Sequence, residues 1–224
     1  LRPPGAGRGG ARRYWKSHYG MTFQAYSRAR RMGLAMNGIR EGQDTIDAAI
    51  ATGYDSDTGF RDAFERILGA PPARAGQVQA MLCRWLDTPL GAMLAVANDE
   101  ALVLLEFIDR RMLETQIHTL RKRFSAAVVP GTNAILDQTD RELREYFAGT
   151  RKSFDVPWQA PGTEFQQRVW RALCDIPYGS TESYGELARR LGHPDAQRAV
   201  GKTNGDNRLA IIIPCHRVIK SDGT

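Results

Sequence analysis

The chain has 224 residues, of which 42% are hydrophobic and 25% are charged. These values are typical of a soluble globular protein of one or two domains with a sizeable core. The sequence also excludes a helical membrane protein, because no apolar run reaches the roughly 20 residues that cross a bilayer. The first residues contain no apolar core like that of a signal peptide, so we expect a cytoplasmic protein without membrane contact.

The formal net charge of +6 is concentrated in the N-terminal third. Residues 1–76 hold 12 Lys and Arg against 7 Asp and Glu, whereas residues 77–224 hold 19 against 18. The N-terminal third is therefore the better candidate for a phosphate-binding surface, although charge alone slightly favours an ordinary solvated surface.

The cysteines Cys83, Cys174 and Cys215 are odd in number and far apart, and no CxxC pair occurs. This pattern argues against a disulfide framework and against a zinc site, so we predict no bound metal. A lone cysteine is usually a buried small hydrophobe. We expect that role for Cys83 and Cys174, because both fall within apolar patterns of helical spacing.

In chain order, the Gly-, Pro- and Arg-rich residues 1–12 predict a flexible arm. A long helix is expected from about Thr22 to Ile39, with Thr22 as its N-cap. The segment TIDAAIATGYDSDTGFRDAFERILGAPP then predicts two short helices around a Gly-containing turn. Asp55 or Ser56 caps the second helix, and the pair is typical of a helix-turn-helix.

The middle of the chain alternates strand and helix patterns around a looser stretch at 125–134. The expected elements are a linking helix or strand over 77–87, a β-hairpin over 90–109, and helices over 111–124 and 135–148.

The C-terminal part predicts a helix from Glu164 and then a second helix-turn-helix. The first helix of this pair starts at Thr181 or Ser183 and the second follows Pro194. A continuous apolar run over 209–213 then predicts a buried strand that leads into the sequence Pro-Cys-His-Arg.

The segment Pro-Cys-His-Arg, which contains Cys215, lies directly after this run, so we expect the backbone of the cysteine to be held rigidly. A nucleophilic cysteine must be a thiolate, yet only about 3% of a free thiol is ionised at neutral pH. The adjacent imidazole of His216 can take the proton. Neighbours on a strand point to opposite faces, so the transfer needs a water relay or a local turn.

The sequence IIIPCHRVI, preceded by Asn207, resembles the active-site motif of the O6-alkylguanine-DNA alkyltransferases. The likeness continues upstream over FQQRVWRALCDIPYGSTESYGELARRLGHPDAQRAVG. It covers about residues 88–224 and is strongest over 164–219. The resemblance implies a single-turnover repair enzyme that acts on double-stranded DNA containing O6-alkylguanine and needs no cofactor.

The resemblance also implies a role for each matching residue. Cys215 is the alkyl acceptor, His216 is its base through water, Asn207 orders that network, and Tyr184 protonates the leaving guanine. Arg198 replaces the flipped base, which must leave the duplex for chemistry. The small residues Ala196, Ala199 and Gly201 let the recognition helix approach the minor groove. Considered alone, each of these two residues has an ordinary interpretation of about equal weight. Arg198 would then be a solvated helix arginine and Tyr184 a core aromatic residue.

The N-terminal third resembles the helix-turn-helix module of AraC-type regulators, although a convincing first helix is missing. An AraC-type module ahead of an alkyltransferase is the arrangement of the Ada-type adaptive-response proteins. By this resemblance Ser56, Thr58 and Arg61 face DNA, and the partners include promoter DNA and RNA polymerase. The alternative interpretation, that these three are ordinary exposed helix residues without DNA contact, has about equal weight.

The resemblance predicts a multi-domain fold. Its parts are a flexible arm (1–12), an all-α AraC-type module (13–76), an α+β ribonuclease-H-like subdomain (77–160), and an α-rich, winged-helix-like active-site domain (161–224). In the family an active-site loop and a glutamate-bearing helix follow the Pro-Cys-His-Arg segment, and this sequence ends at Thr224 before either. We therefore expect a shortened chain. The alternative function is a DNA-binding regulator or lesion-recognition protein with an inactive alkyltransferase domain.

Overall fold

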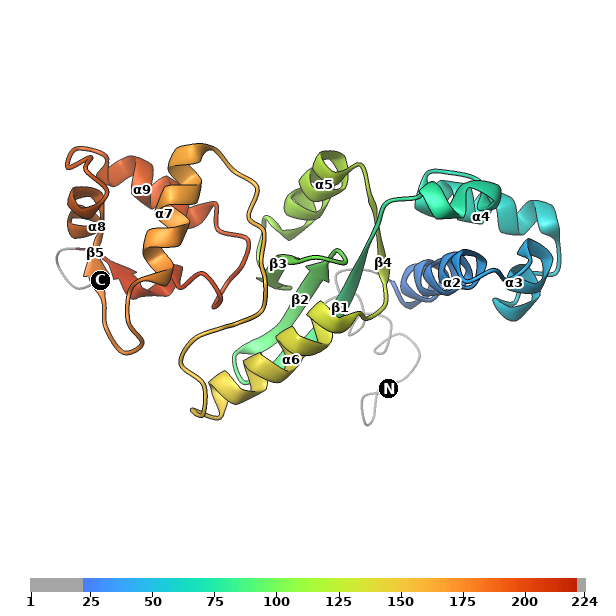
Figure 1. Cartoon of the computed structure of the whole chain (residues 1–224), viewed down its shortest axis with the longest axis horizontal. Helices are drawn as coiled ribbons and strands as arrows, with labels where there is room; N and C mark the ends of the chain where they lie inside the picture. Colours follow the sequence, from blue (N-terminus) through green and yellow to red (C-terminus); the bar gives the residue numbers. More distant parts are fainter. Residues whose placement is uncertain (1–21, 221–224) are drawn as a thin grey trace.

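The computed structural model describes residues 22–220, and Figure 1 shows them as three parts along the long axis of the molecule. Blue and cyan helices adjoin a central sheet, and a second group of helices, in orange and red, lies beyond the sheet. The predicted arm over 1–12 and the start of the module over 13–76 lie outside the described residues. Within residues 22–220, no helix is both long and apolar enough to cross a membrane.

The N-terminal part consists of α2 (Phe23–Arg40), α3 (Thr45–Ala51) and α4 (Asp57–Leu68). The hydroxyl of Thr22 caps α2 by accepting the Ala25 N–H at 3.1 Å, and the hydroxyl of Ser56 caps α4 by accepting the Gly59 N–H at 3.2 Å. Side-chain caps satisfy N–H groups that have no partner inside the helix, for about 1 kcal/mol each. The long helix, its cap and the helix pair are confirmed.

The central part is a four-stranded sheet in the order β3-β2-β1-β4. A short 3₁₀ helix (Pro72–Gln77) leads into it, and its strands are β1 (Ala80–Thr88), β2 (Gly91–Ala97), β3 (Leu102–Phe107) and β4 (Ala127–Pro130). The first three form an antiparallel meander, and β4 pairs with β1 in parallel. The predicted hairpin is confirmed as β2–β3, and the segment 77–87, left open between helix and strand, contains most of β1.

Helices cover both faces of this sheet, which explains why its strands are almost continuously apolar. On β2, Met93 and Ala95 face a core shared with α6 (Ala134–Phe147), whereas Leu94 and Val96 face a core shared with α5 (Leu113–Phe124). Alternate residues of a strand point to opposite faces, so a strand covered on both sides is apolar at every position.

The N-terminal helices pack against β4, at the free edge of the sheet. Ala127 and Val129 of β4 belong to the same core as Met32, Phe60 and Phe64. A Cβ atom placed on Gly33 of α2 would lie 3.2 Å from the Val129 side chain, so the absence of a side chain permits this close packing.

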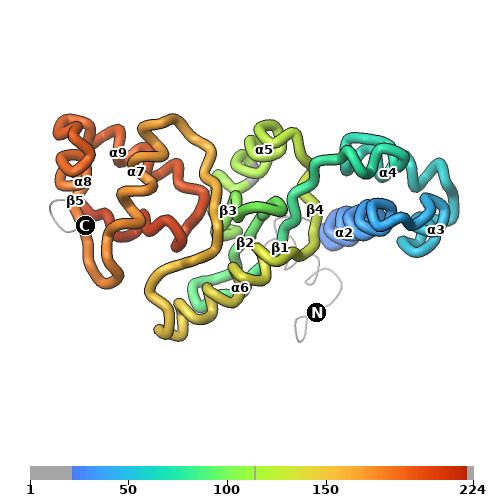
Figure 2. The backbone as a smooth tube through the Cα atoms, viewed as in Figure 1, coloured from blue at the N-terminus to red at the C-terminus, as the bar shows by residue number. Residues whose placement is uncertain are grey.

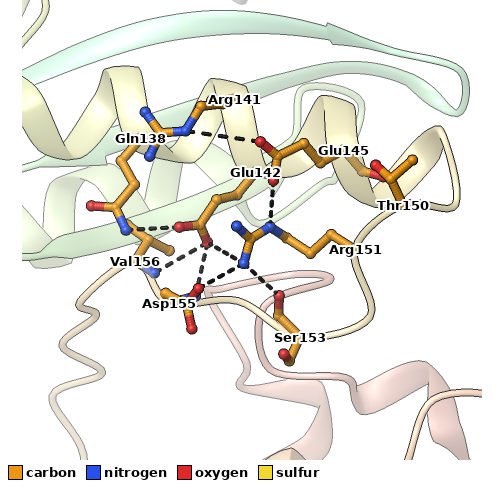
Figure 3. Close-up of polar contacts among 9 residues, drawn as sticks. All are labelled: Gln138, Arg141, Glu142, Glu145, Thr150, Arg151, Ser153, Asp155 and Val156. Carbon is orange, nitrogen blue, oxygen red and sulfur yellow. Dashed lines mark hydrogen bonds and ion pairs between the residues drawn. The ribbon is translucent and has the colours of Figure 1, made fainter.

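A linker over residues 148–163 connects α6 with the C-terminal part and passes along β3 (Figure 2). Its start is anchored by the buried carboxylate of Glu142, which accepts the N–H groups of Asp155 at 2.8 Å and Val156 at 3.2 Å (Figure 3). Arg151 supports the same anchor through Glu145, at 2.7 Å. A buried carboxylate that accepts several hydrogen bonds fixes the path of the chain around it.

The outer edge of β3 is covered by two segments of the C-terminal half. Leu102 donates its N–H to Pro157 and accepts from Gln159. Leu105 donates to the Arg208 carbonyl and accepts from Ala210, both at 2.8 Å. The sheet edge therefore holds both the linker and the segment that precedes Cys215.

The C-terminal part has a helical core. Its elements are α7 (Glu164–Cys174), β5 (Glu182–Ser183), α8 (Tyr184–Arg190), α9 (Gln197–Gly205), a 3₁₀ turn (Cys215–Arg217) and β6 (Val218–Ile219). Capping boxes at Thr163 and Ser183 begin α7 and α8, which confirms the predicted starts. The indole of Trp170 donates to the Thr203 carbonyl at 3.1 Å and joins α7 to α9.

Four local predictions are wrong. The run 209–213 is buried as expected, but only Leu209 pairs as in a strand, with Leu105, and 210–213 are turns and a bend, because an apolar run shows burial without showing its conformation. The stretch 125–134 contains β4, whose pairing partner is distant in sequence. Cys83 lies in β1 instead of a helix, although it is buried as expected. Cys174 ends α7 but is exposed.

Candidate active site

The segment before Cys215 is a compact, buried turn. Ile211 adopts φ +72° with only 7% of its surface exposed. A β-branched residue in this left-handed region is strained by about 1–3 kcal/mol. Such strain persists only where the surrounding contacts fix the backbone, so this turn is held in place from outside.

Asn207 supplies most of that restraint. Its side chain is buried, donates to the Ile213 carbonyl at 2.9 Å and accepts the Leu209 N–H at 2.9 Å. The two bonds clamp both ends of the turn. The structure thus brings Asn207 to the backbone that carries Cys215, while its amide has no direct bond to His216 or to the Cys215 sulfur.

Cys215 begins a 3₁₀ turn and is half-buried. Its N–H donates to the Ile213 carbonyl at 2.8 Å. Its carbonyl accepts the side-chain amide of Asn204 at 3.1 Å. The backbone of the cysteine is therefore fixed on both sides while part of its side chain faces solvent.

The pairing of β5 with β6 brings Tyr184 close to the Cys215 turn. Ser183 pairs with Ile219 in β6, which starts directly after the Cys215 turn, and Tyr184 follows Ser183 in sequence. The Tyr184 hydroxyl lies 3.3 Å from the Asn204 amide nitrogen. A Cβ atom on Gly201 would lie 3.7 Å from the Tyr184 ring, so Gly201 borders the tyrosine.

Asn204 is the site residue that sequence reasoning missed. One nitrogen atom of its side chain contacts both the Tyr184 hydroxyl and the Cys215 carbonyl. The available signal was its place on α9, one helical turn after Gly201. Its partners lie 20 and 11 residues away along the chain, so only the fold reveals the link.

His216 lies beside Cys215 on the same turn and is exposed. Partial desolvation, together with the neighbouring Arg217 cation, lowers the pKa of the imidazole. The neutral form, which can accept a proton, is therefore favoured. Because residues 215–217 form a turn and no strand, the imidazole and the thiol are not forced to opposite faces.

Arg217 anchors the far end of the turn. Its guanidinium is buried, donates to the Ile176 carbonyl at 2.6 Å and lies over the Tyr178 ring at 5.7 Å. Burial raises the pKa of the Cys83 thiol to about 12. Cys174 is exposed as a residue, but desolvation of its thiol by the surrounding protein, followed by the nearby Asp175 carboxylate, raises the thiol pKa to about 11. Both thiols are therefore protonated at neutral pH and are poor nucleophiles.

The exposed face of α9 carries the predicted recognition residues. Arg198 and Ala199 are exposed, and Ala196 is the half-buried N-cap residue. Arg198 forms no ion pair with any residue in the range 22–220. The opposite face of α9 is buried through Val200 and Thr203, so the face with Arg198 and Ala199 points to solvent.

The other predicted DNA-binding residues lie at the start of α4. Ser56, Thr58 and Arg61 are all exposed. The Ser56 hydroxyl is engaged as the helix cap, and Arg61 pairs with Asp57 at 2.9 Å. Among residues 22–220, His, Cys, Asp and Glu side chains form no cluster of three or more that could hold a metal.

Three family models match the chain. The DNA-binding domain of 6-O-methylguanine DNA methyltransferase matches residues 164–224, the ribonuclease-like domain of the same family matches 81–160, and a helix-turn-helix domain matches 5–77. The fold and these matches define a multi-domain protein that joins a helix-turn-helix domain to the two domains of a DNA methyltransferase.

Individual relatives agree with this assignment. A methylated-DNA–protein-cysteine methyltransferase of Mycobacterium tuberculosis is 44% identical over 140 residues, which are 62% of this chain and 79% of the relative. A relative with the same description from Methanosarcina barkeri is 40% identical over 139 residues, with 62% and 82% covered. The structure of Mycobacterium tuberculosis OGT in complex with DNA has a TM-score of 0.54 and 40% identity, covering 64% of this chain and 81% of that chain. The chain belongs to the methylated-DNA–protein-cysteine methyltransferase family.

Proposed function

We propose that this protein repairs DNA by moving the alkyl group of an O6-alkylguanine onto the sulfur of Cys215, once per molecule. The observation that carries the proposal is the bridge made by Asn204, which joins the backbone of Cys215 to the hydroxyl of Tyr184. A nucleophile and a proton donor held together by one side chain suit the displacement of a poor leaving group.

In the proposed reaction, His216 accepts the thiol proton through water and leaves a thiolate. The thiolate forms a carbon–sulfur bond to the alkyl carbon while the bond from that carbon to O6 breaks. The electron pair of the broken bond passes to guanine, which takes a proton from the Tyr184 hydroxyl. The product is a stable thioether on Cys215, and no cofactor enters the balance. Asn207 contributes by holding the turn that presents the sulfur.

The orientation of the Asn204 amide determines the direction in which the hydroxyl proton of Tyr184 points. A flipped amide would set its oxygen against the Cys215 carbonyl oxygen, and two acceptors repel. The nitrogen therefore faces both partners and donates to the tyrosine oxygen. Since that oxygen accepts from Asn204, the phenolic proton points away from it and is available to the leaving base.

We further propose that α9 enters the minor groove of the damaged duplex, with Arg198 taking the place of the flipped base. Ala196, Ala199 and Gly201 add no bulk between helix and DNA. In this proposal an all-α AraC-type module over 13–76 contacts promoter DNA through Ser56, Thr58 and Arg61 and acts with RNA polymerase. The α+β ribonuclease-H-like part spans 77–160, the winged-helix-like part spans 161–224, and the protein works in the cytoplasm.

The test is intact-protein mass spectrometry after incubation with a duplex that contains O6-methylguanine. We expect a gain of one methylene mass that peptide mapping assigns to Cys215. The matched control is Cys215→Ser, which should show no gain and should bind the duplex as tightly as the native chain.

The outcomes separate the two readings of the chain. A methylene gain on Cys215 supports repair. No gain in folded protein that still binds the damaged duplex contradicts alkyl transfer by this chain and favours the alternative of a DNA-binding or lesion-recognition protein. A gain that persists in Cys215→Ser would exclude Cys215 as the acceptor.

A further inference from the structure

A groove runs between the end of α5, the linker and α7, away from Cys215. It comprises two adjoining cavities of about 650 and 300 Å³, and Arg123, Pro161 and Trp170 line both. The larger cavity is also lined by Trp158 and Arg171, and the smaller one by Arg208. We refer to the two cavities together as the α5–α7 groove.

The charge in this groove is mostly positive and unneutralised. Among residues 22–220, neither Arg123 nor Arg171 nor Arg208 takes part in an ion pair. One guanidinium nitrogen of Arg208 is fully buried and has no hydrogen-bond partner in the same range. The carboxylate that lines the smaller cavity, Asp206, already accepts the Gln166 amide at 3.0 Å.

Two of these arginines act on each other. Burial, followed by the nearby Arg123 cation, lowers the pKa of Arg208, and Asp206 offsets this only in part. Basic residues at the end of a helix are favoured by its dipole, which accounts for Arg123 as the last-turn residue of α5. The dipole does not account for a second, partly buried arginine that faces the first across a cavity.

An anion between the two guanidinium groups would offset their repulsion and accept charge-assisted hydrogen bonds from their accessible nitrogens. The walls include the indole rings of Trp158 and Trp170 and the ring of Pro161, which suit the sugars and bases of a nucleic acid better than they suit a small inorganic ion. The groove also adjoins the recognition helix, because Trp170 bonds the Thr203 carbonyl of α9 and Arg208 follows α9 closely in sequence.

From this geometry we propose that the α5–α7 groove is a second DNA-contact site, in which Arg123 and Arg208 bind phosphodiester groups of the DNA that α9 engages. The inference rests on the proposed function for the identity of the DNA. The groove adds affinity and fixes the direction of the protein on the duplex, and it takes no part in alkyl transfer.

The test is the salt dependence of binding to a fluorescently labelled undamaged duplex, measured by anisotropy. Each phosphate contact contributes about 0.9 to the slope of log affinity against log salt concentration. We expect Arg123→Met to reduce the slope by about 0.9, and the double variant with Arg208→Met to reduce it by roughly 1.8. Arg123 is exposed at a helix end, so its variant should fold normally.

The matched control is Arg141→Met, which removes the same charge from the exposed face of α6, outside the groove. Its slope should equal that of the native chain. Equal slopes for the control and the groove variants would refute the site while leaving α9 binding and alkyl transfer untouched. Reduced slopes in the groove variants, with alkyl transfer absent, would support the site and count only against the catalytic proposal.

A second arm distinguishes DNA from a free phosphate ligand. Inorganic tripolyphosphate is titrated at constant ionic strength while tryptophan fluorescence is followed, because Trp158 and Trp170 line the groove. Saturable quenching that Arg208→Met removes, together with unchanged DNA slopes, would assign the groove to a small phosphate compound and overturn the DNA assignment.

Discussion

Removing the Asn204 side chain should slow alkyl transfer while leaving the intrinsic reactivity of Cys215 unchanged. Asn204 donates to the Tyr184 hydroxyl at 3.3 Å, so the substitution Asn204→Ala deletes the bond that orients the phenolic proton. In the transition state the tyrosine oxygen gains negative charge as its proton passes to guanine. Loss of the hydrogen bond from Asn204 therefore raises the free energy of the transition state more than that of the resting enzyme.

The size of the effect follows from the change in bond strength. A neutral hydrogen bond contributes about 0.5–1.5 kcal/mol, whereas one to a charged group contributes about 1.5–3 kcal/mol. The difference, about 1–1.5 kcal/mol, raises the barrier and corresponds to a roughly tenfold slower transfer. Tyr184→Phe removes the proton donor itself and should cost about 100-fold or more.

The assay is single-turnover transfer from an O6-methylguanine duplex, followed by mass spectrometry of Cys215. The control reaction is carboxamidomethylation of Cys215 by iodoacetamide, in which iodide leaves without needing a proton. Asn204→Ala should slow the first reaction and spare the second. Asn204→Asp should be as slow as Tyr184→Phe, because a carboxylate would accept the phenolic proton and turn it away from the substrate.

A double variant tests the same reasoning independently. In a Tyr184→Phe background the tyrosine oxygen is absent, so Asn204→Ala should have little further effect on transfer. An undiminished tenfold loss in that background, or equal slowing of transfer and carboxamidomethylation, would refute the orienting role. Asn204 would then act only by supporting the Cys215 backbone.

Three further outcomes are expected. Arg198→Ala should weaken repair of the lesion more than binding of undamaged duplex, and equal losses in repair and anisotropy assays would exclude base replacement by Arg198. Since the pKa of His216 is lowered, the neutral imidazole should persist below the ordinary pKa of about 6.5, and the acid limb of the pH–rate profile should therefore lie below pH 6.5. The same shift predicts that the contribution of His216 to the free energy of unfolding falls as the pH drops below 6.5, because the unfolded chain then binds the proton more readily than the folded protein. Glu142→Gln should lower the free energy of unfolding in urea by about 1–3 kcal/mol, because an amide N–H₂ would face buried donors, and the half-exposed Glu145→Gln should cost less.

Local rules predicted the features that depend on a few neighbouring residues. Thr22 is predicted as a helix cap, and Ser56 and Ser183 are each one of two predicted candidates, because a cap acts within three residues of itself. Features that depend on distant pairing were not predictable in the same way. β4 forms only because β1 lies beside it, and the turn at 209–213 has an apolar sequence that fits a buried strand equally well.

The same distinction holds inside the candidate site. Cys215 was found because its motif is contiguous, and Tyr184 because it lies within an extended likeness. In the structure one Asn204 nitrogen contacts both the Tyr184 hydroxyl and the Cys215 carbonyl, and the roles of Tyr184 and Cys215 stay predictions. Asn204 carried no signal of its own, because its importance arises only when α9, α8 and the Cys215 turn meet.

The central sheet explains how these pieces keep their positions. Arg110 donates to the carbonyl of Gly205, the last residue of α9, at 2.6 Å, and its guanidinium is paired with the buried Glu106 of β3. The next residue back on that strand, Leu105, pairs with the segment that leads to Cys215. The end of α9 and the segment before the Cys215 turn are thus tied to one strand. A shift of α9 must therefore move the Cys215 turn with it or break the hydrogen bond from Arg110 to the Gly205 carbonyl, and a hydrogen bond from a charged group contributes about 1.5–3 kcal/mol. Arg110 and Leu105 of the ribonuclease-like part therefore hold the end of α9 and the segment before Cys215 in register with each other.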